Sequence, residues 1–384
     1  ALGKSGALDE NSLRVIETNA AGTIVNTSVP FQFDKDADYD ASSKASGTMV
    51  ILMGGTTGSS ATRYFDIYFN ETGGSFSPPS FGPRIAIEEN DTDMGQAAYR
   101  IDGPGVTMYY QTEAGAFSTM LDSDLNDWLQ WGFDPGPGGV YRGMPNAIFP
   151  ESWFHPGAQN STTVVNAKGP LKITFTSETS DGKWEARWEV YPRYVTMTMV
   201  KQDHSYWFLY EGTPGGSLSG DDDFMYRSNG DKTQLWQSWE ADISGDEWAF
   251  FSDPGVRRSL FVVHHENDGV KDSYFNYNDS MTVFGFGRSN DPLEALITAG
   301  SQHFTVGFLH DTSYTANRDS INSAYKPLSV SLGSPELPGP DVPILVSPAN
   351  AATNIGVPAL LRWRVADRAT GYRLQVATSN TFST

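Results

Sequence analysis

Residues 139–157, GVYRGMPNAIFPESWFHPG, gather phenol, guanidinium, carboxylate and imidazole groups in a stretch with neither helical nor strand periodicity. An arginine can neutralise a ligand carboxylate, while a histidine and a tyrosine can abstract a proton and return one to a leaving group. We therefore predict that Tyr141, Arg142 and His155 are catalytic, with Glu151 orienting His155 or acting as an acid. The alternative is an internal ion pair between Arg142 and Glu151 that holds an irregular loop on a sheet.

Glu211 is a second candidate acid or base, at the end of the strand-like run SYWFLYE (205–211). Alternation along a strand places Trp207, Leu209 and Glu211 on one face, opposite Tyr206, Phe208 and Tyr210. The glycine turn that follows lets the backbone approach a ligand closely. A solvated turn carboxylate is the alternative interpretation.

His264 ends the apolar run SLFVVHH (259–265) and is followed by Glu266 and Asp268. His264 and Glu266 can share a strand face, whereas His264 and His265 point to opposite faces. We predict an acid–base role for His264 in preference to transition-metal binding, which needs further converging ligands. A hydrogen-bonded His–Glu pair at a strand end is the structural alternative.

An alternating acidic run at 34–40 resembles the opening of a calcium-binding loop. Tyr39 stands where an EF-hand has its glycine, so the run predicts at most a looser structural calcium site, with a solvated turn as the alternative. No organic cofactor is expected. The predicted ligands are Asp34, Asp36, Asp38 and Asp40.

Aromatic residues are abundant, with 10 Trp, 17 Tyr and 22 Phe. The apolar faces of sugar rings stack on such side chains, although β-sandwiches also bury aromatics in their cores. The candidate sugar platforms are Trp128, Trp131, Trp153, Trp236 and Trp239.

Composition excludes several classes of function. The net charge of −20 over 384 residues disfavours nucleic acids and anionic lipid surfaces as partners. The absence of cysteine excludes disulfides, thiol nucleophiles and thiolate metal sites. No apolar run is long enough to cross a bilayer. The first residues, ALGKSGALDENS, resemble a chain after signal-peptide removal, so we expect a secreted or cell-surface protein.

Short apolar or alternating runs bounded by Gly, Asn, Asp or Pro recur along the chain, which predicts an all-β fold of stacked antiparallel sheets. Short helices are expected only within 122–131 and 317–325. The predicted organisation is an N-terminal β part (1–100), a large β-sandwich (101–332), a Pro-rich linker (333–342) and a C-terminal module (343–384).

The C-terminal module resembles the first half of a fibronectin type III domain, through its SPAN turn, Trp363, Tyr372 and Leu374. The resemblance covers about half of the length that this family needs. It implies either that the chain continues or that a strand from a neighbouring chain completes the fold.

The run GPLKITFTSETSDGKWEARWEVYPRYVTMTMV (169–200) is similar to the supersandwich of galactose-mutarotase-like and polysaccharide-lyase domains of secreted bacterial proteins. The strand-rich N-terminal part resembles the accessory β-domains that precede catalytic modules. These resemblances imply a protein that acts on an extracellular polysaccharide, as a lyase or a glycoside hydrolase. Two alternatives stay open: a structural or adhesive surface protein that self-associates by strand complementation, and a non-catalytic glycan-binding protein.

Overall fold

The structure is a computed structural model that describes residues 6–58, 60–129, 142–333, 343–347, 349, 361–364, 366 and 372. Contacts divide the chain into two units, one of Gly6–Pro327 and one of Leu328–Thr384 together with Ala1–Ser5. The larger unit carries every candidate site residue that the structure describes.

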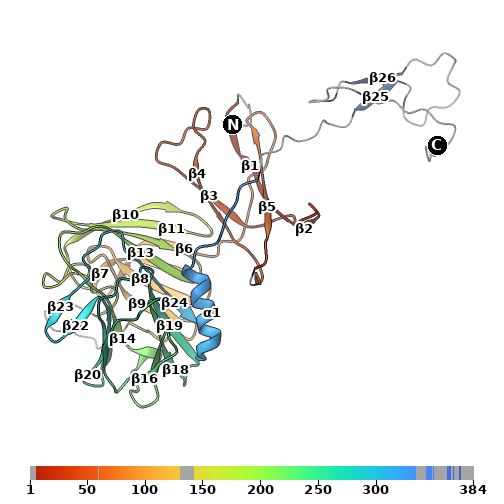
Figure 1. Ribbon diagram of the computed structural model, residues 1–384. Helices are drawn as coiled ribbons and strands as arrows, with labels where there is room; N and C mark the ends of the chain where they lie inside the picture. Colours follow the sequence, from red (N-terminus) through yellow and green to blue (C-terminus); the bar gives the residue numbers. More distant parts are fainter. Residues whose placement is uncertain are drawn as a thin grey trace. The chain divides into compact units, whose positions relative to one another are not determined.

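A nine-stranded antiparallel sheet runs through the larger unit (Figure 1). Two of its central strands are covered on both faces, which explains their nearly continuous apolar sequences. Its strands in spatial order are β10 (Ser161–Lys168), β11 (Ile173–Thr179), β12 (Glu185–Val190), β13 (Tyr194–Lys201), β24 (His303–Leu309), β19 (Arg258–His264), β18 (Trp248–Asp253), β15 (Phe224–Arg227) and β16 (Lys232–Gln234).

Two four-stranded antiparallel sheets pack against one face of the nine-stranded sheet and form the outer layer of a sandwich. Aromatic rings fill the interface: Tyr110 lies 4.6 Å from Phe175, and Phe208 stacks 4.5 Å from Phe304. This confirms the predicted all-β sandwich. The strands are β6 (Ala86–Asp93), β7 (Gln96–Gly103), β8 (Val106–Gln111) and β9 (Ala116–Asp122) in one sheet, and β14 (Phe208–Gly212), β21 (Met281–Phe286), β20 (Asp272–Tyr277) and β17 (Trp239–Ala241) in the other; β22 (Arg288–Asn290) and β23 (Leu293–Ala295) form a hairpin after β21.

The opposite face of the nine-stranded sheet carries the helix α1 (Tyr314–Tyr325), as predicted for 317–325. Alternation in β18 directs Phe251 toward the main core, while Trp248 and Phe250 join a second cluster with Ile321 of the helix. Within the described part of the chain, no helix is long and apolar enough to cross a membrane.

The helical turn expected at 122–131 is not present in its described portion, residues 122–129. The side chain of Asp122 accepts hydrogen bonds from the backbone N–H of Asp124 (2.8 Å) and of Asn126 (3.1 Å), and from the Trp128 indole (3.1 Å). An acidic side chain that bonds nearby N–H groups in this way stabilises a turn at the expense of helix.

The N-terminal part forms two small sheets, β2–β1–β5 and β3–β4, around their own apolar cluster. The strands β6 and β7 already belong to the sandwich, so this part ends before residue 86 and not at residue 100. Gln32 joins it to the sandwich, because its Oε1 accepts the backbone N–H of Leu171 and of Lys172. The strands are β1 (Leu8–Thr18), β2 (Ile24–Asn26), β3 (Phe31–Lys35), β4 (Gly47–Ile51) and β5 (Tyr64–Glu71).

In the smaller unit, β25 (Ile344–Ser347) pairs with β26 (Arg362–Arg364). The Trp363 and Tyr372 rings lie 5.5 Å apart, and the Tyr372 hydroxyl accepts the Ala366 N–H at 2.7 Å. The fibronectin type III assignment stays a prediction, as does the linker at 333–342, most of which lies outside the described residues.

Candidate functional site

Residues 143–147, here called the bridging segment, join the edges of the two outer sheets. On one side Met144 exchanges two backbone hydrogen bonds with Phe117 of β9, at 2.7 and 2.9 Å. On the other side Gly143 and Ala147 accept the backbone N–H groups of Glu211 and Trp207, each at 3.1 Å. Gly143 lies so close to β9 that a Cβ there would be 2.2 Å from the Phe117 carbonyl oxygen.

The bridging segment brings three of the predicted catalytic residues together. The Arg142 guanidinium lies 3.5 Å from the Glu211 carboxylate and 3.3 Å from His155 Nε2. Glu211 lies 3.9 Å from the same imidazole nitrogen. The Asn146 amide donates to Glu211 at 3.1 Å. All three predicted side chains are nearly buried, with exposures of 9% for Arg142, 6% for Glu211 and 2% for His155.

The hydrogen bonds of His155 fix its tautomer. Its Nδ1 donates to the Pro156 carbonyl at 2.9 Å, so in the neutral ring Nε2 carries the lone pair and faces Arg142. Burial and the neighbouring Arg142 charge lower the pKa of His155 below 6.5, and together they outweigh the opposing effect of Glu211. At neutral pH this imidazole is therefore an unprotonated base.

Buried neighbours hold both halves of the site in place. Phe154, immediately before His155, is completely buried even though its φ of +48° lies in the left-handed region. In β14, Phe208 and Tyr210 pack into the core against Phe304 and Phe251, which turns Glu211 to the outer face as the alternation predicts.

Sequence reasoning missed four neighbours of this cluster: Asn146, Phe149, Trp207 and Arg288. Asn146 and Phe149 belong to the irregular stretch 139–157. Alternation along the strand places Trp207 on the same face as Glu211. Only Arg288 gave no signal, because it comes near Glu211 through strand pairing. In the structure the Phe149 ring lies 5.0 Å from Trp207, and the Arg288 guanidinium lies 5.4 Å from the same ring.

Two of the predicted residues, Tyr141 and Trp131, lie outside the described residues, so their predicted roles stay predictions. Glu151 pairs with His204 at 3.2 Å and with neither Arg142 nor His155. The ion pair expected between Arg142 and Glu151 is therefore wrong, because Glu211 is the carboxylate that contacts Arg142.

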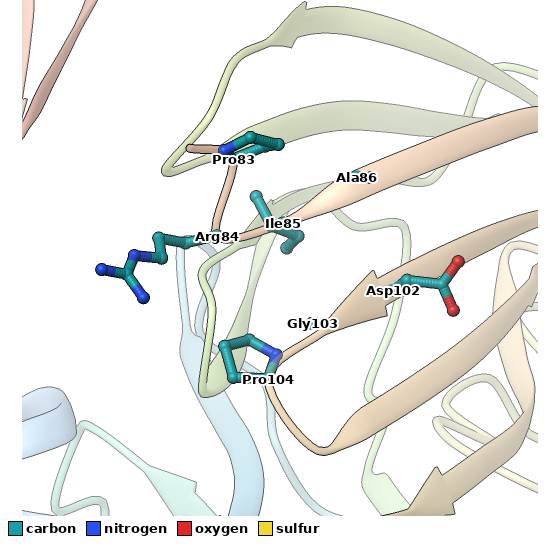
Figure 2. Close-up of a pocket in the computed structure, with 7 residues that line it drawn as sticks. All are labelled: Pro83, Arg84, Ile85, Ala86, Asp102, Gly103 and Pro104. Atoms are coloured by element: carbon teal, nitrogen blue, oxygen red, sulfur yellow. The ribbon is translucent and has the colours of Figure 1, made fainter. Parts of the chain in front are cut away.

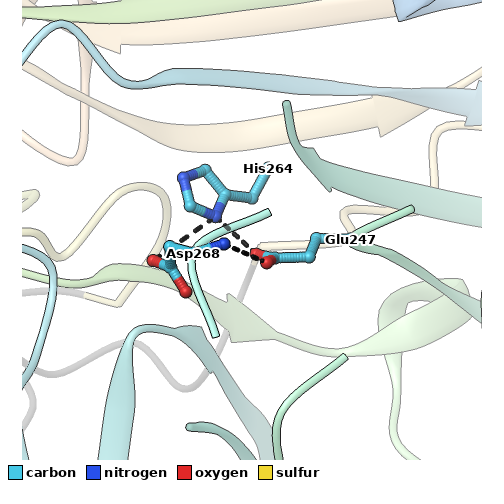
Figure 3. A group of neighbouring side chains, drawn as sticks. All are labelled: Glu247, His264 and Asp268. Carbon is cyan, nitrogen blue, oxygen red and sulfur yellow. Dashed lines mark hydrogen bonds and ion pairs between the residues drawn. The ribbon is translucent and has the colours of Figure 1, made fainter. Parts of the chain in front are cut away.

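His264 lies in a different cluster, on the nine-stranded sheet (Figure 3). Its Nδ1 lies 2.6 Å from Glu247 and its Nε2 lies 2.7 Å from the side-chain oxygen of Gln302. Glu247, His264 and Asp268 are the one metal-ligand grouping among the described residues, but both imidazole nitrogens already bond to acceptors. The arrangement is that of a buried imidazolium, and it does not join Arg142, His155 and Glu211.

This cluster predicts a pH-dependent stability. Burial would lower the pKa of His264, but the bond and charge of Glu247, with Gln302 and Asp268, raise it above 6.5. A raised folded-state pKa gives stability that is complete below pH 6.5 and is lost as the pH rises through that pKa. Urea unfolding should show His264→Gln costing about 3–5 kcal/mol near the acid end, since it breaks a buried pair. The difference from wild type should shrink toward alkaline pH.

His265 is the matched control for this measurement. It is the next residue along the chain, and burial lowers its pKa to about 4, so it stays neutral over the same range. In the unfolded chain its pKa is 6.5, so the stability that neutral His265 contributes is constant above pH 6.5 and is lost as the pH falls toward 4. The difference between His265→Gln and wild type should therefore be constant above pH 6.5 and shrink toward acid pH, the opposite trend to that of His264→Gln. A pH-independent difference for His264→Gln would contradict the imidazolium assignment.

The described tryptophans fall into different environments. Trp128 is fully buried, with its indole bonded to Asp122, which leaves no ring face for a sugar and corrects its prediction as a platform. Trp153 is partly buried against the core, and Trp239 lies 4.5 Å from the Arg227 guanidinium. Trp236 is 56% exposed and stays a candidate platform away from the cluster.

The acidic run 34–40 does not converge on a cation site. Asp34 pairs with Lys172 at 2.9 Å and Asp38 pairs with Lys44, so lysines supply the positive charge. Asp40 accepts the backbone N–H groups of Ser42 and Ser43, and Asp36 is exposed. Calcium binding here stays a prediction, which the placement of these carboxylates does not favour.

A hollow of about 310 Å³ lies at the ends of β6 and β7 (Figure 2). Pro83, Ile85 and Pro104 provide much of its lining, and the charged groups are those of Arg84 and Asp102. Asp102 accepts a hydrogen bond from Thr107 at 2.8 Å. None of the candidate catalytic residues lines this hollow.

Comparisons with known proteins give structural neighbours at low TM-scores. No family model matches the chain, and no curated protein matches its sequence. Solved structures that match include HI1317 (8% identity, 59% of this chain and 99% of that chain, TM-score 0.40). A putative mutarotase from Salmonella typhimurium is 11% identical, and the match covers 55% of this chain and 90% of that chain at a TM-score of 0.40. A galactose mutarotase related enzyme from Lactobacillus acidophilus is 10% identical, and the match covers 56% of this chain and 98% of that chain at a TM-score of 0.38. Galactose-mutarotase-like folds are thus among its structural neighbours, at TM-scores that carry no conclusion about activity.

Proposed function

We propose that this chain is an extracellular polysaccharide lyase that cleaves a uronic-acid-containing polymer. The observation that carries the proposal is the convergence of Arg142, His155 and Glu211 at one buried point of the outer layer. A neutral imidazole base beside a guanidinium is the pairing that β-elimination next to a carboxylate needs.

In the proposed reaction, Arg142 and the Asn146 amide bind the sugar carboxylate and stabilise the charge that develops on it when C5 loses its proton. His155 Nε2 takes that proton, the C4–O bond breaks, and a C4=C5 double bond forms. The proton returns from His155 to the leaving oxygen, so no further reactant is consumed. Glu211 acts as a positioning residue, holding Arg142 and stabilising the transient imidazolium across 3.9 Å.

A hydrolase is the less favoured reaction. Glycoside hydrolysis ordinarily uses two carboxyl groups that flank the scissile bond. The cluster around Glu211 supplies a neutral base and a guanidinium, which are the groups that elimination uses.

Incubation with a panel of uronate polymers and neutral polysaccharides tests the proposal. We expect ultraviolet absorbance from the unsaturated sugar to rise with at least one uronate polymer and with none of the neutral ones. New reducing ends without that absorbance would indicate hydrolysis, and binding without any cleavage would indicate a glycan-binding protein. Either outcome would refute the lyase.

The C-terminal residues fit the same proposal as an accessory module. A fibronectin type III unit at 343–384 would serve as a spacer that carries the catalytic unit over a polymer. Light scattering of the chain with and without residues 343–384 separates this role from self-association by strand complementation, in which the full chain alone would form assemblies.

A further inference from the structure

Arg288 is a buried cation on the outer face of the sheet that carries Glu211. Its side chain crosses the surface over Gly285, where an added Cβ would meet Leu209 at 2.2 Å and Arg288 at 3.0 Å. Gly285 pairs with Leu209, which lies two residues before Glu211 on the same face. The Arg288 side chain therefore lies beside Leu209, the neighbour of Glu211 on this face of the strand.

Arg142 forms an ion pair with Glu211, whereas Arg288 bonds to neutral side chains. Its Nη1 donates to Ser273 (3.1 Å) and to Asn290, which are neutral acceptors. Among the described residues, no carboxylate lies within ion-pair distance of it. Burial lowers the pKa of Arg288 to about 10, with only partial compensation from the charges of Glu211 and Glu240.

Two buried donors at this position have no acceptor within the described chain. They are Nε of Arg288, whose residue is 6% exposed, and Nε1 of Trp207, whose residue is 4% exposed. A buried donor without a partner is costly and calls for an explanation. An anionic ligand group beside Arg288 would balance the guanidinium and supply an acceptor at this position.

An apolar surface adjoins these donors. Phe149 is 39% exposed and its ring lies 5.0 Å from that of Trp207, at an interplanar angle of 32°. The outward face of such a ring suits the C–H face of a sugar.

We infer that Arg288, Trp207 and Phe149 form a second subsite that binds the acidic group, carboxylate or sulfate ester, of the sugar adjacent to the cleaved one. The inference rests on the proposed function for its assignment to a saccharide. It explains how a chain of net charge −20 can accept an anionic polymer, since two buried arginines offset the repulsion locally.

Calorimetric titration of His155→Gln, the variant expected to cleave slowest, tests the subsite with little turnover. The probes are a uronic acid oligomer, its carboxyl-reduced counterpart and a sulfated galactan oligomer. We expect Arg288→Met to weaken binding of one or both anionic oligomers by about 10- to 100-fold, as for a lost charge-assisted hydrogen bond. Arg288→Lys should retain part of the affinity, and the neutral oligomer should be unaffected. The anionic oligomer whose affinity falls in Arg288→Met identifies the acidic group that the subsite binds.

Arg227→Met is the matched control. Arg227 is also buried and lies 4.5 Å from a tryptophan ring, that of Trp239, but it has a carboxylate partner, Asp231, at 3.5 Å. This variant should lose stability and keep its affinity. Arg288→Met should keep or gain thermal stability, because it removes a buried charge that has no carboxylate partner.

The outcomes separate this inference from the proposed function. Binding that depends on Arg288 without cleavage of any polymer would refute the lyase and support the subsite. Cleavage with equal anion affinity in wild type and Arg288→Met would refute the subsite alone. Failure of all three oligomers to bind, or a marked loss of stability in Arg288→Met with unchanged affinity, would also overturn it.

Discussion

His155→Gln is expected to lower the rate of polymer cleavage by about 10²- to 10⁴-fold, the usual contribution of a general base. Glutamine can still donate to the Pro156 carbonyl and accept from Arg142, so the fold and the substrate affinity should stay close to wild type. The rate loss should therefore appear in kcat and not in KM. Steady-state kinetics on the responsive polymer measure both.

The pH profile of the same reaction is a second readout of this role. Because the pKa of His155 is lowered from 6.5, the base is competent at neutral pH, and the rate should fall as the pH drops through that lowered pKa. The acid limb should be absent from the residual activity of His155→Gln. Persistence of an identical limb in the variant would assign it to another group.

His204→Gln is the control for this substitution. His204 bonds the carbonyl of its following residue through Nδ1 (2.7 Å) and a charged side chain, Glu151, through Nε2 (3.2 Å). These local bonds resemble those of His155, but neither of them involves Arg142 or Glu211. His204→Gln should keep full activity, and an equal loss in both variants would contradict a special role for His155.

Glu211→Ala is expected to lower the free energy of unfolding by about 3–5 kcal/mol, as for removal of one partner from a buried ion pair. The Arg142 guanidinium would lose this carboxylate while Arg288, a second cation, remains nearby. Urea unfolding measures the change. Glu151→Ala, which breaks a more exposed pair, should cost no more than about 1 kcal/mol.

The double variant Arg142→Met/Glu211→Leu distinguishes charge from packing. Replacing both partners of a buried pair by apolar groups restores much of the stability that a single removal costs. We expect the double variant to be more stable than Glu211→Ala and to have no activity. A Glu211→Ala variant within 1 kcal/mol of wild type would contradict the buried pair.

Strand rhythm sufficed to predict the sandwich and the outward face of Glu211, because alternation is a local property of the chain. Closeness in sequence sufficed to place Arg142 and His155 together, since they belong to one irregular stretch. Local pattern gave no means of separating His264 from this group. His264 ends a strand of the nine-stranded sheet, and the sheet to which a strand belongs depends on long-range pairing.

The same limit explains the other differences. Arg288 approaches Glu211 only through the pairing of β14 with β21, which no short motif encodes. Tryptophan is a residue type that stacks on sugar rings, yet core packing and the hydrogen bond to Asp122 bury Trp128. At 122–129, an aspartate that captures backbone N–H groups overrides helical spacing, so the chemistry of one side chain decided the local structure.

The bridging segment implies that substitution and length change have different consequences at this site. Its backbone is hydrogen-bonded on both sides, to Phe117 and to Glu211, so its register is fixed from two directions. Insertion or deletion of one residue within 143–147 would turn Asn146 to the opposite side and shift Arg142 away from Glu211. Homologues that retain the chemistry are therefore expected to vary in side chains along this segment but to keep its length.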